Sequence, residues 1–313
     1  MKHIVDKNFF PGWTRKAVTF TIDDGNVEMD KLFLSYVRPA GILGTFNLCG
    51  DRLDRLPREE LLALYDGYGI ANHCRYHPFC MKDGIEYRTV DEVFDEKTAD
   101  PELLYRHPKI DGLYLYHGPR GWRRMATPEA YIRMIEESRA DIEEAFGEGY
   151  GRSFVIPFSR TVSEYFENWV RTSGVRSVRG YIGGGADPTD DFSLPKDRSA
   201  WSFNARNSTL AAEAERFEGY PDDGRLHWLC FGVHSIDYET GGNWGDLNDA
   251  CDRLGNRPES YYTASVDTIF DYEDAIGALT VTDDAIVNPS ALDLCVTVDG
   301  VRRTVPRRST LPL

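Results

Sequence analysis

Strand-like and helix-like hydrophobic patterns alternate along the first third of the chain. Residues 17–22 are β-branched, aromatic or apolar and stop at two aspartates and a glycine, which predicts a strand followed by a turn. A second such run covers residues 44–48, and residues 58–65 follow with apolar side chains at helical spacing. A short apolar run at 68–72 then leads into His73. Strands that alternate with helices predict a parallel α/β sheet or barrel.

The same alternation resumes after a less regular stretch. Residues 84–125 are rich in Asp, Arg, Pro, Tyr and Gly, which predicts an inserted segment or a long active-site loop. Thr127 followed by Pro128 predicts the start of a long helix. The run 226–233 is the most apolar strand-like segment and ends at His234. We therefore predict one α/β unit that the segment 84–125 interrupts.

The C-terminal part has a different pattern. Two β-rich runs, 292–298 and 301–305, flank an Asp-Gly dipeptide, which is typical of a tight hairpin turn. We predict a barrel domain over residues 1–280 and a C-terminal β-hairpin cap over residues 281–313 that packs on the barrel.

Composition and charge exclude several classes of function. Of the 313 residues, 41% are hydrophobic, so the chain can bury a large core without a structural metal or a disulfide. A net charge of −15 repels phosphate backbones and anionic lipid, which argues against nucleic-acid and membrane partners. No apolar stretch reaches the roughly 20 residues of a membrane-spanning helix, and no signal-peptide pattern is visible at the amino terminus. Six scattered cysteines without a Cys-x-x-Cys pair read as reduced thiols, and we expect a cytoplasmic protein.

Candidate chemistry gathers where predicted strands end. Asp23 and Asp24 follow the strand at 17–22, and adjacent acids at a strand end can point in different directions. One of them can then bind a metal while its neighbour accepts a proton. An Asp-Gly dipeptide is also common in plain turns, so this pair alone leaves both interpretations open.

Two histidines at 73 and 77 form the second candidate group. Their spacing lets both face one metal if the segment forms a helical turn. A zinc protease of the His-Glu-x-x-His type is disfavoured, because Cys74 occupies the position of the glutamate. Two partly exposed loop histidines are the alternative. His234, at the end of the most apolar strand, is either a packed histidine or a general acid.

Together these segments resemble the polysaccharide deacetylases of the NodB-homology type, carbohydrate esterase family four. The Thr-Phe-Asp-Asp-Gly motif of that family appears at 21–25 with Ile in place of Phe. Its His-Ser/Thr-x-x-His-Pro motif appears at 73–78 with Cys74 in place of the hydroxyl residue. Its late strand that ends in histidine corresponds to the strand before His234. The order and broad spacing of these segments agree over about residues 15–270.

The resemblance implies a distorted (β/α) barrel and a division of roles among the site residues. Asp24, His73 and His77 would hold one divalent metal, with zinc preferred over cobalt, nickel, iron or manganese. Three protein ligands leave positions open for water and for the acetyl carbonyl. Asp23 would act as the general base. His234 would act as the general acid that protonates the leaving amine or alcohol.

One motif of the family departs from its pattern. The family's Arg-x-Pro corresponds to Val-Ile-Pro at 155–157, so the arginine that orients the catalytic aspartate is missing there. Arg160 is the candidate replacement from the same loop, and a candidate substrate contact. The backbone N–H of Phe158, after the proline, would stabilise the oxyanion of the reaction. Loss of the arginine would be consistent with a weakened or repurposed enzyme.

The preferred function is hydrolysis of an N-acetyl group on an amino sugar or an oligosaccharide. Trp244, in a loop that resembles one subgroup of the family, could stack on a sugar or pack at the base of the loop. An O-acetyl carbohydrate esterase or a small-molecule amidohydrolase would use the same residues. The alternative of another class is a carbohydrate-binding protein that retains the metal without turnover. The intact pair of Asp23 and Asp24 favours an enzyme.

Overall fold

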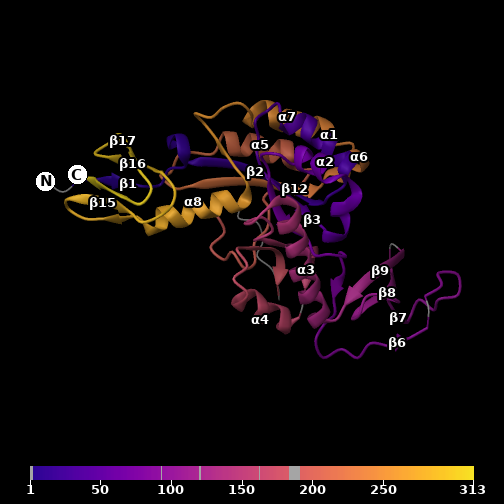
Figure 1. Ribbon diagram of the computed structural model, residues 1–313. Coiled ribbons are helices and arrows are strands. Elements are labelled where there is room, and N and C mark those ends of the chain that lie inside the picture. The colour runs from indigo at the N-terminus through magenta and orange to yellow at the C-terminus, as the bar shows by residue number, and fades with distance from the viewer. Residues whose placement is uncertain (1–2, 93, 120, 162, 183–190) are drawn as a thin grey trace.

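The structure, a computed structural model, describes residues 3–313 except 93, 120, 162 and 183–190. Its centre is a curled parallel sheet with the strand order β11-β10-β4-β3-β2-β12, and β13 pairs with the start of β2 (Figure 1). The strands are β2 (Lys16–Asp24), β3 (Thr45–Leu48), β4 (Gly69–Asn72), β10 (Phe154–Thr161), β11 (Val178–Ile182), β12 (His227–His234) and β13 (Tyr262–Thr263). All of these pairings are parallel, so the carboxyl ends of the strands share one edge. The predicted α/β barrel is confirmed in this curled parallel sheet.

Helices connect the strands and cover the sheet (Figure 1). They are α1 (Val27–Val37), α2 (Arg58–Leu64), α3 (Pro128–Phe146), α4 (Glu164–Thr172), α5 (Leu210–Glu218), α6 (Ser235–Gly241), α7 (Trp244–Leu254) and α8 (Val266–Ala278), with 3-10 turns η1 (Pro11–Trp13) and η2 (Gly50–Arg55). The predicted start of α3 is confirmed, because the Thr127 side chain accepts from the Ala130 N–H and Pro128 is the first helical residue. In the part of the chain that the structure describes, no helix is long and apolar enough to cross a membrane.

Aromatic packing fixes the central strands. The Phe20 ring on β2 contacts Phe33 at 5.0 Å and Phe46 at 5.3 Å between ring centroids. A Cβ atom on Gly44 would lie 2.4 Å from the Phe20 ring, which explains the glycine just before β3. Every residue of β12 except His234 is buried, as the apolar run at 226–233 predicted. This packing holds the carboxyl ends of β2 and β12 in fixed positions.

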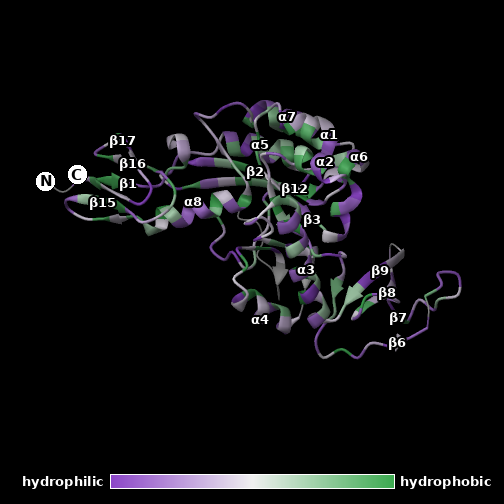
Figure 2. Cartoon of the chain, in the orientation of Figure 1, coloured by the Kyte–Doolittle hydropathy of each residue, from purple (hydrophilic) through white to green (hydrophobic). Residues whose placement is uncertain are grey.

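Residues 79–126 form a second, smaller sheet that projects beside α3 (Figure 1). Its order is β5-β9-β8-β7-β6, with β5 (Phe79–Cys80), β6 (Thr89–Val90), β7 (Leu104–Arg106), β8 (Leu113–Gly118) and β9 (Gly121–Ala126). The sequence predicted an inserted segment or a long loop at residues 84–125, and this segment therefore contains short strands as well as loops. Several of its strands are two or three residues long, too short to show an alternating pattern. Figure 2 shows that the connections near β6 are mostly hydrophilic.

Both ends of the chain contribute to small antiparallel sheets. The predicted hairpin is β16 (Leu294–Val298) and β17 (Val301–Val305), and its turn residues Asp299 and Gly300 have φ of 49° and 79°. β1 (Val5–Asp6) pairs with β16, so the N and C ends lie near each other (Figure 1). A further sheet, absent from the sequence-based prediction, consists of β14 (Thr280–Val281), β15 (Ala285–Asn288) and β18 (Ser309–Pro312).

Candidate active site

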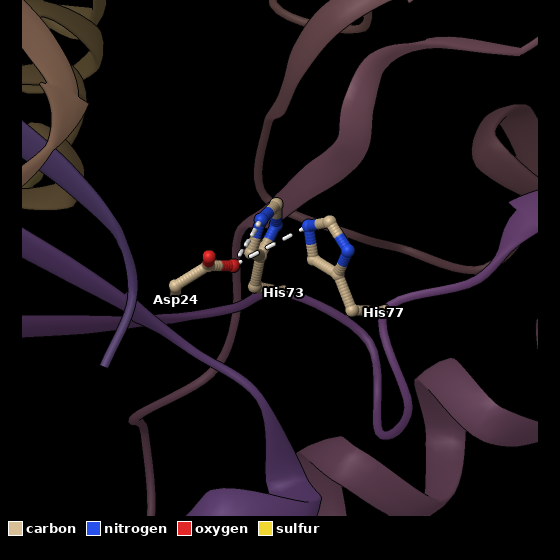
Figure 3. A group of neighbouring side chains, drawn as sticks. All are labelled: Asp24, His73 and His77. Atoms are coloured by element: carbon tan, nitrogen blue, oxygen red, sulfur yellow. Dashed lines mark ion pairs between the residues drawn. The ribbon is translucent and has the colours of Figure 1, made fainter. Parts of the chain in front are cut away.

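Asp24, His73 and His77 converge at the carboxyl edge of the central sheet. Asp24 is the last residue of β2, and the two histidines lie in the loop after β4 (Figure 3). Asp24 Oδ1 lies 3.6 Å from His73 Nε2 and 3.3 Å from His77 Nε2. One ligand atom from each residue lies within 4.8 Å of the others. The structure thus brings the three predicted metal ligands together.

The converging atoms fit a cation. Asp24 Oδ1, His73 Nε2 and His77 Nε2 are all buried and form no hydrogen bond with any described residue. Leaving a single buried polar atom without a partner costs about 1–3 kcal/mol, so three at one point indicate a group that binds them together. His73 Nδ1 lies 2.8 Å from the Val155 carbonyl oxygen, which leaves Nε2 as the ligand atom. Two imidazoles and one carboxylate suit zinc and other first-row divalent ions.

The electrostatics give these three groups the protonation states that ligands require. Burial acts to raise the pKa of Asp24, but His73, His77 and Arg52 outweigh it and lower the pKa to about 2. Burial and the neighbouring His73 lower the pKa of His77 to about 3. Burial also lowers the pKa of His73. At neutral pH the carboxyl group is therefore charged and both imidazoles are neutral, as metal binding requires.

Unusual backbone conformations shape the loop that carries the histidines. Residues 73–78 do not form the helical turn that would let both histidines face one metal, and the loop brings them together in another conformation. Cys74 and His77 have φ of 64° and 51°, and Asp24 has φ of 79°. Left-handed conformations cost non-glycine residues about 1–3 kcal/mol each and tend to cluster at functional sites. Arg52 on η2 supports this backbone by donating to the Asp24 carbonyl oxygen at 2.7 Å.

Asp23, the predicted general base, is held by a buried arginine. The Arg179 guanidinium, from β11, donates to both carboxylate oxygens of Asp23 and also to the Thr21 hydroxyl at 2.9 Å. The Asn47 side chain donates to Asp23 Oδ1 at 2.7 Å. Burial acts to raise the pKa of Asp23, but Arg179, together with His73 and His234, holds it below its ordinary value. Asp23 is therefore ionised and its orientation is fixed.

Arg179 corrects the expectation that the motif arginine is lost. The position at Val155 indeed lacks an arginine, and the side chain of its proposed replacement, Arg160, lies outside the described residues. Arg179 makes the contact with Asp23 from the neighbouring strand β11 instead. Arg179 lies inside the strand-like segment 178–182, and this was a usable signal, because a charge buried in a sheet needs a partner.

His234 lies opposite Asp23 at the end of β12. The two residues are paired across the strands, and His234 Nε2 lies 3.8 Å from Asp24 Oδ2. His234 Nδ1 lies 2.8 Å from the carboxylate of Asp237, a residue that the sequence reasoning did not identify. Burial acts to lower the pKa of His234, but Asp237, Asp23 and Asp24 raise it to about 9. A protonated imidazole near Asp23 can donate a proton to a leaving group.

Phe158 and Trp244 have different surroundings. Phe158 on β10 is 39% exposed, and its ring centroid lies 4.5 Å from that of His77. Trp244 on α7 stacks against Tyr36 and Tyr238 at 5.3 and 5.4 Å. Its indole N–H donates to Glu239. These contacts favour the interpretation of Trp244 as a packed residue.

A family model described as polysaccharide deacetylase matches residues 12–178, more than half of the chain. The chain therefore belongs to the polysaccharide deacetylase family. Among curated proteins, nothing matches this chain.

Solved structures of similar fold carry related descriptions. A protein from Mycobacterium smegmatis assigned as a polysaccharide deacetylase is 12% identical, with a TM-score of 0.51 over 88% of this chain and 97% of that one. A family 4 acetyl xylan esterase from Clostridium thermocellum, in complex with a cobalt ion, is 14% identical with a TM-score of 0.44, over 82% and 92% of the two chains. A family 4 carbohydrate esterase from Streptomyces lividans, in complex with acetate, is 12% identical with a TM-score of 0.42, over 79% and 91%. At 12% identity, the likeness to the Mycobacterium smegmatis protein shows the shared fold.

Proposed function

We propose that the protein is a divalent-metal-dependent hydrolase that removes an acetyl group from the nitrogen of an acetylated amino sugar or oligosaccharide. The observation that carries the proposal is the convergence of Asp24, His73 and His77 through buried atoms that lack partners. An ionised Asp23 and a protonated His234 lie beside this group, on the neighbouring strands β2 and β12. Zinc is the ion that the two histidines and one aspartate suit best.

Each residue of the site has a role that its surroundings support. Asp24, His73 and His77 would hold the ion, which when bound polarises a carbonyl group and makes water more acidic. Asp23 would take the proton from the attacking water, and Arg179 keeps its carboxylate in one orientation.

A second residue, His234, supports the breaking of the bond to the leaving group. His234 would give its proton to the leaving nitrogen, so the hydroxyl group of the water stays on the acetate. The backbone N–H of Phe158 is the proposed donor to the oxyanion. A protein with a net charge of −15 accommodates the cationic amine that N-deacetylation produces.

The test is acetate release by the zinc-loaded protein from three substrate sets: N-acetylated amino-sugar oligomers, O-acetylated xylo-oligomers and small acetamides. We expect release from the first set. Asp23→Asn should retain about one equivalent of zinc and lose turnover by about 10²–10⁴-fold. Release from the second or third set alone would replace the proposal by an esterase or an amidohydrolase. Binding of sugars without acetate release from any set would favour the non-catalytic carbohydrate-binding protein.

A further inference from the structure

A row of aromatic rings leads away from the metal ligand His77. The Phe158 ring lies 4.5 Å from the His77 ring, and Phe79 stacks on Phe158 at 3.6 Å with an interplanar angle of 8°. Tyr116 lies edge-on to Phe79 at 6.1 Å. Phe79 starts β5 and Tyr116 belongs to β8, so the row passes from the central barrel onto the smaller sheet.

Strand pairing places further side chains on the same face of the smaller sheet. Phe79 pairs with Met125, which pairs on its other side with Tyr114. Tyr116 pairs with Arg123. Because side chains alternate along a strand and paired residues share a face, these five side chains point to one side of the sheet.

The opposite face accounts for the packing of this sheet. Leu113 and Ala126 belong to the hydrophobic cluster that includes Tyr131 of α3. Trp122 packs against Phe94, and Trp122 belongs to the same face of the sheet as Leu113 and Ala126. Among the residues that the structure describes, Phe79, Tyr114 and Tyr116 join neither core cluster, and each is only half-buried. The aromatic row is therefore not needed to form the core.

The chemistry of this face suits sugar rings. Aromatic rings offer flat apolar surfaces against which the apolar side of a pyranose can stack, while tyrosine hydroxyls remain available at the edges. Arg123 forms no ion pair with any described carboxylate, although the chain is strongly acidic. Its guanidinium carries five N–H donors that can bind sugar hydroxyls.

We propose that this aromatic face, consisting of Phe79, Tyr114, Tyr116 and Arg123, binds the sugar units next to the one that is deacetylated. The proposal rests on the proposed function for the reaction beside His77, and it makes the substrate an extended acetylated glycan. A chain of several units continues over Phe79 to Tyr116, because these rings are in successive contact.

The experiment is a calorimetric titration of zinc-loaded Asp23→Asn, which leaves the acetylated sugar intact. The ligands are N-acetylglucosamine and its β-1,4-linked tetramer, and acetylated xylose and its tetramer. We expect at least one tetramer to bind about tenfold or more tightly than its monomer. Adding Tyr116→Ala should weaken binding of that tetramer about five- to tenfold and leave the monomer unchanged, whereas Tyr116→Phe should retain the affinity. His117→Ala, the adjacent residue on the opposite face of β8, is the matched control and should change neither affinity.

Equal affinity for monomer and tetramer in both series would overturn the inference. The same holds if Tyr116→Ala has no effect, or if His117→Ala weakens tetramer binding equally. Zinc content and circular dichroism of each variant show whether the fold is retained. Acetate release by the parent protein is measured separately. Acetate release that does not depend on chain length would contradict sugar binding by the aromatic face but support the proposed reaction. Tetramer binding that depends on Tyr116, without acetate release, would support the aromatic face and contradict the proposed reaction.

Discussion

Arg179 and Asp23 form a buried ion pair across the inside of the curled sheet. They lie on β11 and β2, which are separated by three other strands in the sheet order. Only 2% of Arg179 and 7% of Asp23 is exposed. A contact between strands so far apart in the sheet exists because the sheet curls until both strands face the same interior. The orientation of the proposed base thus depends on the closure of the fold.

Replacing Arg179 should affect both stability and turnover. Arg179→Met leaves the Asp23 carboxylate buried without its partner, which should lower the free energy of unfolding by about 3–5 kcal/mol. A carboxylate that is no longer held in position should also lower turnover by about a hundredfold, with zinc content unchanged. Chemical denaturation, elemental analysis and acetate release measure the three quantities.

A second variant separates the charge effect from simple loss of packing. Asp23→Asn added to Arg179→Met removes the unpaired charge, so part of the lost stability should return. Arg160→Ala serves as a control for the arginine that the sequence suggested. If Arg160→Ala reduces turnover as strongly as Arg179→Met, Arg179 is not the residue that replaces the motif arginine.

Zinc binding should depend on His77. We expect His77→Ala to reduce the zinc content from about one equivalent to nearly none, with the fold retained because His77 Nε2 forms no hydrogen bond to a described residue. Zinc at a thousand times its dissociation constant should stabilise the parent by about 4 kcal/mol, and this gain should disappear in the variant. Elemental analysis and thermal unfolding with and without zinc test both. His117→Ala should behave like the parent, and tight zinc binding by His77→Ala would show that the ligand set is wrong.

The alkaline limit of activity should depend on Asp237. Burial acts to lower the pKa of His234, but Asp237 and the two aspartates of the site raise it to about 9. A histidine donates only below its pKa, so activity should fall as the pH rises through that value. Asp237→Asn removes one of the raising charges and should move this fall to lower pH. A bound divalent ion lowers the pKa in both proteins, so the direction of the difference remains.

The measurement is the pH profile of kcat/KM for the parent and Asp237→Asn. Glu239→Gln on the same helix is the matched control, because Glu239 accepts from Trp244 and not from His234. An alkaline limb that stays in place, or moves to higher pH, would contradict the assignment of His234 as the acid.

Trp244 should contribute to stability rather than to sugar binding. Its ring stacks on Tyr36 and Tyr238, so Trp244→Ala should lower the free energy of unfolding by about 2–4 kcal/mol. KM for the sugar should be unchanged, and Trp244→Phe should recover much of the stability. Denaturation and steady-state kinetics measure these effects. A raised KM with unaltered stability would instead support a stacking platform for the sugar.

The sequence was informative about candidate site residues that lie at the end of a strand. Asp23, Asp24 and His234 end strands that were visible as apolar runs, and parallel strands bring their carboxyl ends to one edge. His73 was found for the same reason, since it follows β4 directly. The local sequence pattern was enough to find these residues, because neighbouring parallel strands then place them side by side at one edge of the sheet.

The sequence was less informative where a contact depends on the closed shape. Arg179 meets Asp23 only because the sheet curls, and the two are 156 residues apart in the chain. The strands of the smaller sheet pair through long connections, and β5 and β6 have only two residues each. The turn that aims His77 uses left-handed backbone conformations, which residue types other than glycine rarely signal.

The pairing of His234 with Asp23 determines which parts of the sequence can be substituted without moving these two residues. Both residues belong to neighbouring strands joined in register from His227 to His234, so their spacing is that of two hydrogen-bonded strands. The aromatic face, by contrast, belongs to the smaller sheet, whose residues 79–126 lie in the chain between His77 and α3. Substitutions and even exchange of the segment 79–126 can therefore alter which glycan is recognised while the distance between proton acceptor and proton donor stays constant. Recognition and reaction are in this sense separate modules of one chain.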